Sequence, residues 1–332
     1  MKPRYPLSRS CIALLIVCLL PSIASAQMPH FDSLYVFGDS LADNGNVLIQ
    51  SKFLGAQPPV PPLPTYFNGR FSNGYVGFEY LWQTLAHKRL EGPQSLRPFL
   101  AAPFVRGAAI NFAYGGTGTA YVDQTPGGMW APGLKGQVEL FRQTFRNKKP
   151  SERALYAIAT GANDYRVDQF NQPMPYAQVV RNIEEAIVSL YRLGARDVMV
   201  LDLPNLGLLP GGDGSGTFVS QTHNDLLYPM LANLQERLPR LHLIPITLQT
   251  PFDELIGMMG PFGSTVPALM AFFPPPPGMA LCLFVNPASC EDASTLFNVN
   301  LGFLFWDVVH PTTEAHHYLA DHLYKELEAS YD

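Results

Sequence analysis

The feature that most constrains this chain is the alternation, from residue 33 onward, of short apolar runs with longer helical patterns. Apolar runs of four to six residues, typical of buried strands, lie at 34–37, 109–113, 155–159, 198–203 and 241–246. Apolar side chains recur at helical spacing within 75–90, 138–145, 179–190, 227–238 and 315–327. This alternation predicts one α/β domain, in which a parallel sheet is covered by helices on both faces.

Composition excludes two classes of protein. The 332 residues are 47% hydrophobic and 15% charged, with a net charge of −5. A disordered chain combines low hydrophobicity with high net charge, so disorder is excluded as the main state. The negative charge also excludes a strongly basic nucleic-acid binder, and a chain of this length can bury a large core.

The first 26 residues have the pattern of a secretion signal peptide. Positive side chains at Lys2, Arg4 and Arg9 precede a ten-residue apolar run at 11–20, and Ala24-Ser25-Ala26 supplies small residues for cleavage. We therefore expect a mature domain at 27–332, exported to the periplasm or the extracellular medium. Loss of three cations changes the net charge from −5 to −8. The alternative is an uncleaved anchor.

Two cysteines remain in the predicted mature chain, Cys282 and Cys290. In an exported protein, two cysteines eight positions apart indicate a disulfide that closes a short loop. Two free, buried thiols are the alternative. No cysteine or acidic pattern indicates a structural metal ion.

A long segment at about 260–305 interrupts the alternation. It contains four consecutive prolines at 274–277 together with several large apolar residues. A segment of this length without a strand or helix pattern is usually functional or disordered, and its apolar content argues against disorder. Two interpretations remain open: a cover or interfacial flap beside an active site, or an insertion that packs a small core of its own.

Four polar groups follow predicted strands or precede a predicted helix, where ligands bind in an open parallel sheet. Ser40 follows the first strand, and the glycines Gly115 and Gly116 follow the second. Asn163, which follows the third strand, carries an amide that can donate to a developing negative charge. Before the last helix, Asp307 precedes His310 by three positions, so its carboxylate can reach the imidazole.

Each group also has a plain structural interpretation. A serine after a strand is commonly a helix cap, and an Asn-Asp pair is commonly a turn. An Asp and a His at this spacing can be two surface groups. The glycine pair has no Lys-Ser/Thr after it and lacks the third glycine of a dinucleotide fingerprint, so neither phosphate-binding motif is present.

Taken together and in order, these groups resemble the GDSL branch of the SGNH hydrolases, a family of serine esterases and lipases. The blocks that carry the resemblance are Gly38-Asp39-Ser40-Leu41 with the five residues after it, 68–74, 111–116, 161–164 and 307–310. They cover nearly the whole predicted mature chain, with no departure at a catalytic position. The resemblance implies a flavodoxin-like three-layer α/β/α sandwich with a central, mostly parallel sheet. There is no G-x-S-x-G elbow around Ser40, which disfavours an ordinary α/β-hydrolase lipase.

The resemblance also assigns roles residue by residue. Ser40 is the nucleophile, His310 its general base, and Asp307 orients His310. The oxyanion hole consists of the backbone N–H groups of Ser40 and Gly116 and the side-chain amide of Asn163. These roles agree with the chemistry, because a serine hydroxyl needs an adjacent base and the tetrahedral oxyanion needs preorganised donors.

The sequence thus predicts a secreted carboxylic ester hydrolase acting on lipids, lysophospholipids or other acyl esters. Alternatives are a short-chain acetyl, choline or carbohydrate esterase, an acyltransferase with the same triad and, least favoured, a non-catalytic binding protein. No metal, cofactor, nucleic acid or partner protein is indicated, whereas the apolar segment is compatible with transient contact with a membrane surface. We further hypothesise that this segment and the residue after it form an acyl pocket, with candidate lining residues Phe272, Phe273, Phe284 and Trp306.

Overall fold

The computed structural model describes residues 28–332 except 93, 103–107, 126–127, 148, 167–172, 211–213 and 260–303. The predicted signal peptide, the two mature cysteines and nearly all of the predicted insertion therefore lie outside the described residues. Within the described part, no helix combines the length and apolarity needed to cross a membrane.

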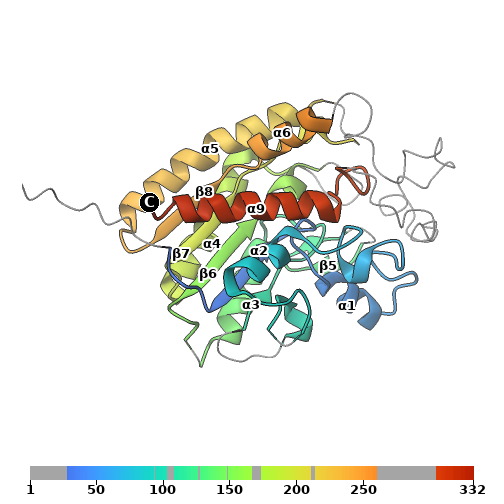
Figure 1. Cartoon of the computed structure of the whole chain (residues 1–332), viewed down its shortest axis with the longest axis horizontal. Helices are drawn as coiled ribbons and strands as arrows, with labels where there is room; N and C mark the ends of the chain where they lie inside the picture. The colour runs from blue at the N-terminus through green and yellow to red at the C-terminus, as the bar shows by residue number, and fades with distance from the viewer. Residues whose placement is uncertain are drawn as a thin grey trace, which may run out of the picture.

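The centre of the molecule is a parallel sheet of six strands (Figure 1). In spatial order the strands are β2 (Arg97–Pro98), β3 (Ile110–Asn111), β1 (Ser33–Gly38), β6 (Ala154–Ala159), β7 (Asp197–Leu201) and β8 (His242–Ile246). The β1–β6 pair is the longest, from Ser33 opposite Ala154 to Gly38 opposite Ala159. Both of these strands are buried along their whole length, as expected for strands covered on two faces.

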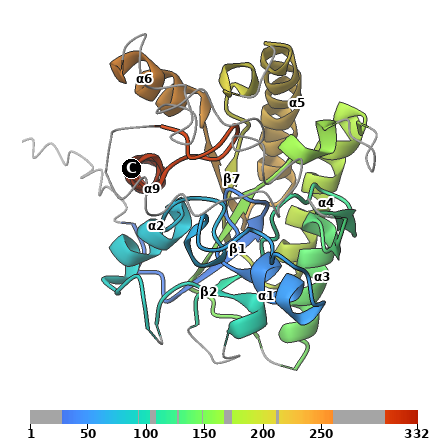
Figure 2. The ribbon, with the colours of Figure 1, turned by 90° about the vertical axis from the view of Figure 1, so that its right-hand side faces the viewer.

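Helices cover both faces of the sheet and form a three-layer sandwich (Figure 2). One face packs against α2 (Gly77–Ala86), α6 (Gln249–Met259) and α9 (Thr313–Ala329). The other packs against α3 (Leu134–Thr144), α4 (Tyr176–Leu193) and α5 (Gly216–Arg237). Alternate residues of each strand separate the two cores: Leu34 and Val36 face the first group, and Tyr35 and Phe37 the second.

The remaining elements lie around the edge of the sheet that β2 and β3 form. They are α1 (Asn46–Phe53), a small antiparallel pair, β4 (Asp123–Gln124) with β5 (Trp130–Ala131), and the 3₁₀ turns η1 (Phe67–Gly69) and η2 (Phe99–Ala101). Two further 3₁₀ turns, η3 (Ala162–Tyr165) and η4 (Leu206–Leu208), follow β6 and β7 directly. Since they begin where parallel strands end, η3 and η4 lie at the carboxyl edge of the sheet.

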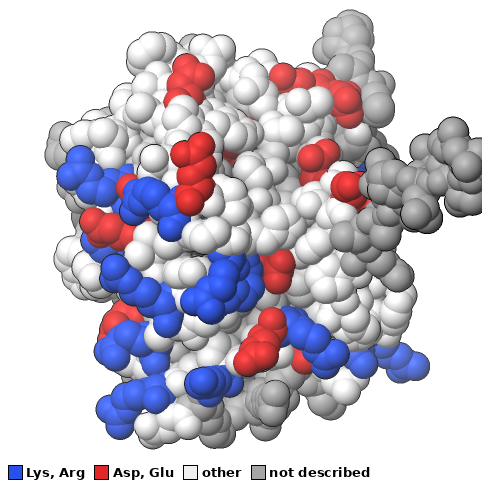
Figure 3. All heavy atoms as spheres, turned by 90° about the vertical axis from the view of Figure 1, so that its left-hand side faces the viewer, with Lys and Arg blue, Asp and Glu red and all other residues white. Residues whose placement is uncertain are grey.

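Positive side chains gather at the amino end of the sheet. The last turns of α3, α4 and α5 carry Arg142, Arg192 and Arg237, which is the favourable sign at a helix C-terminus. These helices end where β6, β7 and β8 are about to begin, so their arginines gather at the amino end of the sheet. Figure 3 shows this end, with many Lys and Arg side chains over its surface.

The predicted fold class is confirmed: the chain is an α/β/α sandwich in which every strand pairing of the central sheet is parallel. The predicted helix at 179–190 is the middle of α4, with Ile183, Ile187 and Leu190 fully buried and Gly194 ending the helix at a φ of 114°. Glycine suits that position because this φ is strained for other residues.

Candidate active site

Ser40 lies at a sharp turn directly after β1. The backbone of this turn is fixed on both sides: Asp39 N–H donates to Ala159 O at 3.2 Å, and Leu41 N–H donates to the Asp39 carboxylate at 3.0 Å. Gly38 has to be glycine, because a Cβ there would lie 2.3 Å from Ala159 O. Ser40 is half-buried and lines a cavity at the carboxyl end of the sheet.

Asp43 joins the Ser40 turn to the glycine loop after β3. Its buried carboxylate accepts Gly45 N–H at 2.8 Å and Asn46 N–H at 2.7 Å, and it accepts Gly115 N–H across the site at 2.9 Å. Burial raises the pKa of Asp43 to about 6, and the backbone donors oppose that rise. The carboxylate therefore holds Gly116, which follows Gly115 with a φ of 79°, in a fixed position relative to Ser40.

Asn163 lies in η3 with both ends of its side-chain amide engaged. Nδ2 donates to Thr117 O at 3.1 Å, one residue beyond Gly116. Oδ1 accepts from Nη1 of Arg166 at 3.3 Å. One hydrogen of the Nδ2 group is thus directed at Thr117, and the second is available to a ligand in the cavity that Asn163 lines.

Asp307 and His310 form a buried pair in the loop before α9. His310 Nδ1 lies 2.6 Å from Asp307 Oδ2, and Tyr66 Oη donates to the same oxygen at 2.7 Å. The other carboxylate oxygen accepts the backbone N–H groups of Val309 and His310, at 2.9 and 2.7 Å. Burial alone would raise the pKa of Asp307, but His310 and these donors lower it below its ordinary value. Asp307 is therefore ionised and fixes the imidazole in one orientation.

The block at 68–74 holds the loop that carries His310. The Phe71 ring lies against the His310 ring, with centroids 5.3 Å apart. Ser72 Oγ donates to Pro311 O at 2.8 Å, and the Asn73 side chain accepts Thr313 N–H at 2.8 Å. Residues far from His310 in sequence therefore position it from two directions.

Two further buried acids flank the site. Burial raises the pKa of Asp39 to about 6, although the nearby His310 opposes the rise. Burial likewise raises the pKa of Asp164 to about 7, against hydrogen bonds from the backbone N–H and the hydroxyl of Thr119. Asp164 thereby ties η3 to the loop after Gly116.

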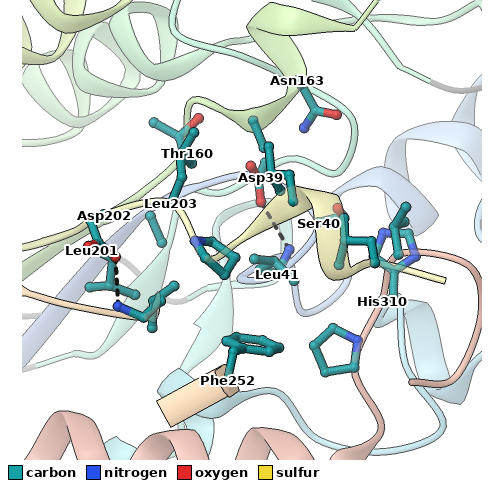
Figure 4. Close-up of a pocket in the computed structure, with 18 of the residues that line it drawn as sticks. Asp39, Ser40, Leu41, Thr160, Asn163, Leu201, Asp202, Leu203, Phe252 and His310 are labelled. Carbon is teal, nitrogen blue, oxygen red and sulfur yellow. Dashed lines mark hydrogen bonds between the residues drawn. The ribbon is translucent and has the colours of Figure 1, made fainter. Parts of the chain in front are cut away.

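The cavity beside Ser40 has a volume of about 230 Å³ and crosses the carboxyl end of the sheet (Figure 4). Ser40, Asn163 and His310 line it together with apolar residues from the ends of β6 and β7, from η4 and from α6. Asp307 lies behind His310 and is not among the lining residues. Gly116 does not line it either, but lies next to Thr117, which holds Asn163.

Of the predicted triad and oxyanion-hole residues, the structure thus places Ser40, Asn163 and His310 in the wall of one cavity, with Asp307 bonded to His310, and it places Trp306 elsewhere. Trp306 is 3% exposed, and its ring packs in a separate apolar cluster that includes Val47, Tyr66 and Phe71. The backbone explains this, because Trp306 N–H donates to His310 O in a tight loop, and the ring is held behind that loop. Trp306 therefore does not line this cavity, and its assignment to an acyl pocket stays a prediction. Phe272, Phe273, Phe284, Cys282 and Cys290 lie outside the described residues.

Sequence reasoning missed Arg166, Tyr66 and the apolar wall of the cavity. Tyr66 follows a proline-rich stretch and Arg166 an Asn-Asp turn, and neither context signals a contact with a residue distant in sequence. In the part of the chain that the structure covers, no cluster of three His, Cys, Asp or Glu residues could hold a metal ion.

Comparisons with known proteins match nearly the whole chain. The model of the family described as GDSL-like lipase/acylhydrolase matches residues 34–323. A phosphatidylcholine-sterol acyltransferase of Aeromonas hydrophila is 28% identical, with 95% of this chain and 97% of that protein aligned. A GDSL esterase/lipase of Arabidopsis thaliana is 24% identical, over 94% and 97%. Among solved structures, a GDSL-like lipase from Parabacteroides merdae has a TM-score of 0.45 at 12% identity, over 92% of this chain and 99% of that one.

Proposed function

The chain belongs to the GDSL-like lipase/acylhydrolase family and is a carboxylic ester hydrolase, and we propose that it cleaves its substrate through an acyl-enzyme on Ser40. The observation that carries this mechanism is the buried Asp307–His310 pair, whose imidazole lines the same cavity as Ser40. A serine hydroxyl becomes an effective nucleophile when such a base removes its proton.

In the proposed reaction, Asp307 accepts a hydrogen bond from the Nδ1–H group of His310, so Nε2 carries no proton and serves as the base. Ser40 Oγ attacks the ester carbonyl carbon while Nε2 takes the hydroxyl proton. The oxyanion accepts hydrogen bonds from Asn163 Nδ2 and from the N–H groups of Ser40 and Gly116. His310 then gives its proton to the leaving alcohol, and the Ser40 ester forms as the alcohol departs. Water, deprotonated by His310, hydrolyses this ester in the same manner.

A second candidate function is acyl transfer to an alcohol. It is supported by the Aeromonas hydrophila relative named as an acyltransferase, which aligns along 95% of this chain. The two functions share every step up to the acyl-enzyme and differ in whether water or an alcohol attacks it. We further propose that residues 1–26 direct export to the periplasm or beyond, that Cys282 and Cys290 pair there, and that the enzyme meets lipid esters in transient contact with a membrane surface.

The mechanism is tested by hydrolysis of p-nitrophenyl esters with wild type, Ser40→Ala and the matched control Ser189→Ala. Ser189 donates to Glu185 O on the surface of α4, away from the cavity. We expect wild type and Ser189→Ala to be active and Ser40→Ala to lose activity by several orders of magnitude. Equal activity of Ser40→Ala and wild type would contradict the acyl-enzyme. Product analysis with glycerol or cholesterol as added acceptor separates transfer from hydrolysis.

A further inference from the structure

The cavity beside Ser40 is strongly asymmetric. Ser40, His310, Asn163 and Arg166 contribute polar side chains to its wall. Most of the other lining residues are apolar, and six of them follow β7 or β8: Leu203, Pro204, Leu206, Leu209, Leu248 and Phe252. They come from the segment after β7, from η4 and from the start of α6, so three separate elements contribute to one apolar surface.

The far end of the cavity contains one acid, but its charge is fully engaged. Asp202 is 4% exposed, and its carboxylate accepts Leu248 N–H at 2.6 Å and Tyr228 Oη at 2.8 Å. These bonds join the segment after β7 to the segment after β8 and to α5. A ligand that reaches this end therefore meets mainly apolar side chains and an acid whose oxygens already accept hydrogen bonds.

The position of His310 decides which part of an ester enters the apolar end. His310 lies on one side of Ser40, and Leu201, Leu203 and Phe252 lie on the other (Figure 4). The leaving oxygen must face His310 to receive its proton. The substituent on the opposite side of the carbonyl carbon is the acyl group, and it therefore points toward the leucines and Phe252.

We propose that Leu203, Leu206, Leu209, Leu248 and Phe252 form the acyl-chain site and select linear, medium-length acyl esters. This inference rests on the proposed acyl-enzyme at Ser40. It uses residues that no sequence motif identifies.

The dimensions of the cavity set the chain length. A cavity of about 150 Å³ holds one benzene ring of six carbons, so about 230 Å³ has room for roughly eight to ten carbons. The cavity extends from the end of β1 to the end of β8, which is three strand spacings or about 14 Å. Acetyl esters leave most of this surface unfilled, whereas palmitoyl chains exceed it.

The test is the kcat/KM profile for p-nitrophenyl acetate, butyrate, octanoate, decanoate and palmitate. Wild type should peak at octanoate or decanoate. Leu206→Trp fills the site and should lower the ratio of kcat/KM for octanoate to kcat/KM for acetate at least tenfold. One methylene too many in an apolar pocket lowers kcat/KM by about tenfold or more. Phe252→Ala enlarges the site and should move the optimum to longer chains.

The matched control is Leu208→Trp on the same 3₁₀ turn. Leu208 is 38% exposed and does not line the cavity, so its profile should equal that of wild type. Thermal melting confirms that each variant is folded. If wild type hydrolyses none of the esters, the proposed function fails. If it is active but peaks at acetate, or if Leu206→Trp and Phe252→Ala keep the wild-type profile, the acyl-site proposal fails and the acyl-enzyme stands.

Discussion

At the scale of single residues, the amide of Asn163 shows how a catalytic donor can be oriented before substrate arrives. An amide can rotate by half a turn and present oxygen where nitrogen is needed. Here Thr117 O accepts from Nδ2, and Arg166 Nη1 donates to Oδ1, so both contacts favour the same orientation. A reversed amide would place its NH₂ group against the Arg166 cation and its oxygen against a carbonyl.

Arg166 is therefore predicted to be a positioning residue for Asn163. A hydrogen bond to a charged group contributes about 1.5–3 kcal/mol, so Arg166→Ala should lower kcat about 10- to 100-fold. Arg166→Lys retains the cation and should recover part of that loss. Asn163→Ala alone should cost about 10²–10³ in kcat.

Steady-state kinetics on the double variant distinguishes positioning from general support of the fold. If Arg166 acts through Asn163, adding Arg166→Ala to Asn163→Ala has little further effect on kcat. Full additivity of the two losses in kcat would contradict the positioning role.

At the scale of elements, α5 brings a buried histidine under the η3 turn. His223 Nδ1 lies 2.7 Å from Tyr165 Oη at the end of η3, and its ring lies beside Gly161. Burial lowers the pKa of His223 to about 4. The folded protein therefore keeps this histidine neutral over a range of pH in which the unfolded chain, with a pKa near 6.5, takes up a proton.

The sign of the resulting pH dependence follows from that difference. The stability contributed by neutral His223 is complete above about pH 6.5 and is lost as the pH falls toward 4, the value of its pKa in the folded protein. The loss amounts to about 3 kcal/mol. Asp39, Asp43 and Asp164 titrate in the same range with the opposite sign, because burial raises their pKa values.

A comparison of wild type with His223→Gln separates the titration of His223 from that of the three buried aspartates. Urea unfolding at pH 7, 5.5 and 4.5 should show the free-energy difference between wild type and His223→Gln decreasing as the pH falls. Circular dichroism measures both proteins under the same conditions. A difference that stays constant over this range would show that His223 does not titrate as the structure indicates.

The elements that the sequence predicted are those whose pattern is set by burial alone. Strands β1 and β6 are buried throughout and consist mainly of apolar residues, and α4 has a regular apolar stripe, so apolar runs and helical spacing identified them. In α1 the buried residues include Asn46 and Ser51, and β2 has two half-buried residues. Neither element shows a regular spacing of apolar residues, because contacts with distant loops determine which of its residues are buried.

The site divides in the same way. Ser40, Asn163 and His310 each follow a strand or precede a helix, and the resemblance to a known family assigned their roles. The apolar wall of the cavity could not be predicted, since leucines after a strand look like ordinary core residues. Only the tertiary structure decides which apolar residue meets the substrate. Phe252 lines the cavity, whereas Trp306 packs in the cluster that contains Phe71.

At the scale of the whole molecule, the cavity and the basic surface lie at opposite ends of the sheet. Ser40 follows the carboxyl end of β1, whereas Lys149, Arg192 and Arg196 lie before β6 or β7, at the amino end. Figure 3 views this amino end. If the enzyme acts on esters at a lipid surface, the cavity must face the lipid, and the cations then point away from it.

This arrangement predicts that the basic end is not used in substrate recognition. Lys149→Glu with Arg192→Glu should leave kcat/KM for a soluble p-nitrophenyl ester within about twofold of wild type, because surface charges this far from the site are screened at physiological salt. Hydrolysis of anionic phospholipid vesicles, followed by release of free fatty acid, should be equally unaffected. Melting temperature provides the folding control, since surface substitutions usually change stability by less than about 0.5 kcal/mol. A loss confined to the vesicle assay would show that the basic end contacts the lipid, and it would require a different orientation of the enzyme at the surface.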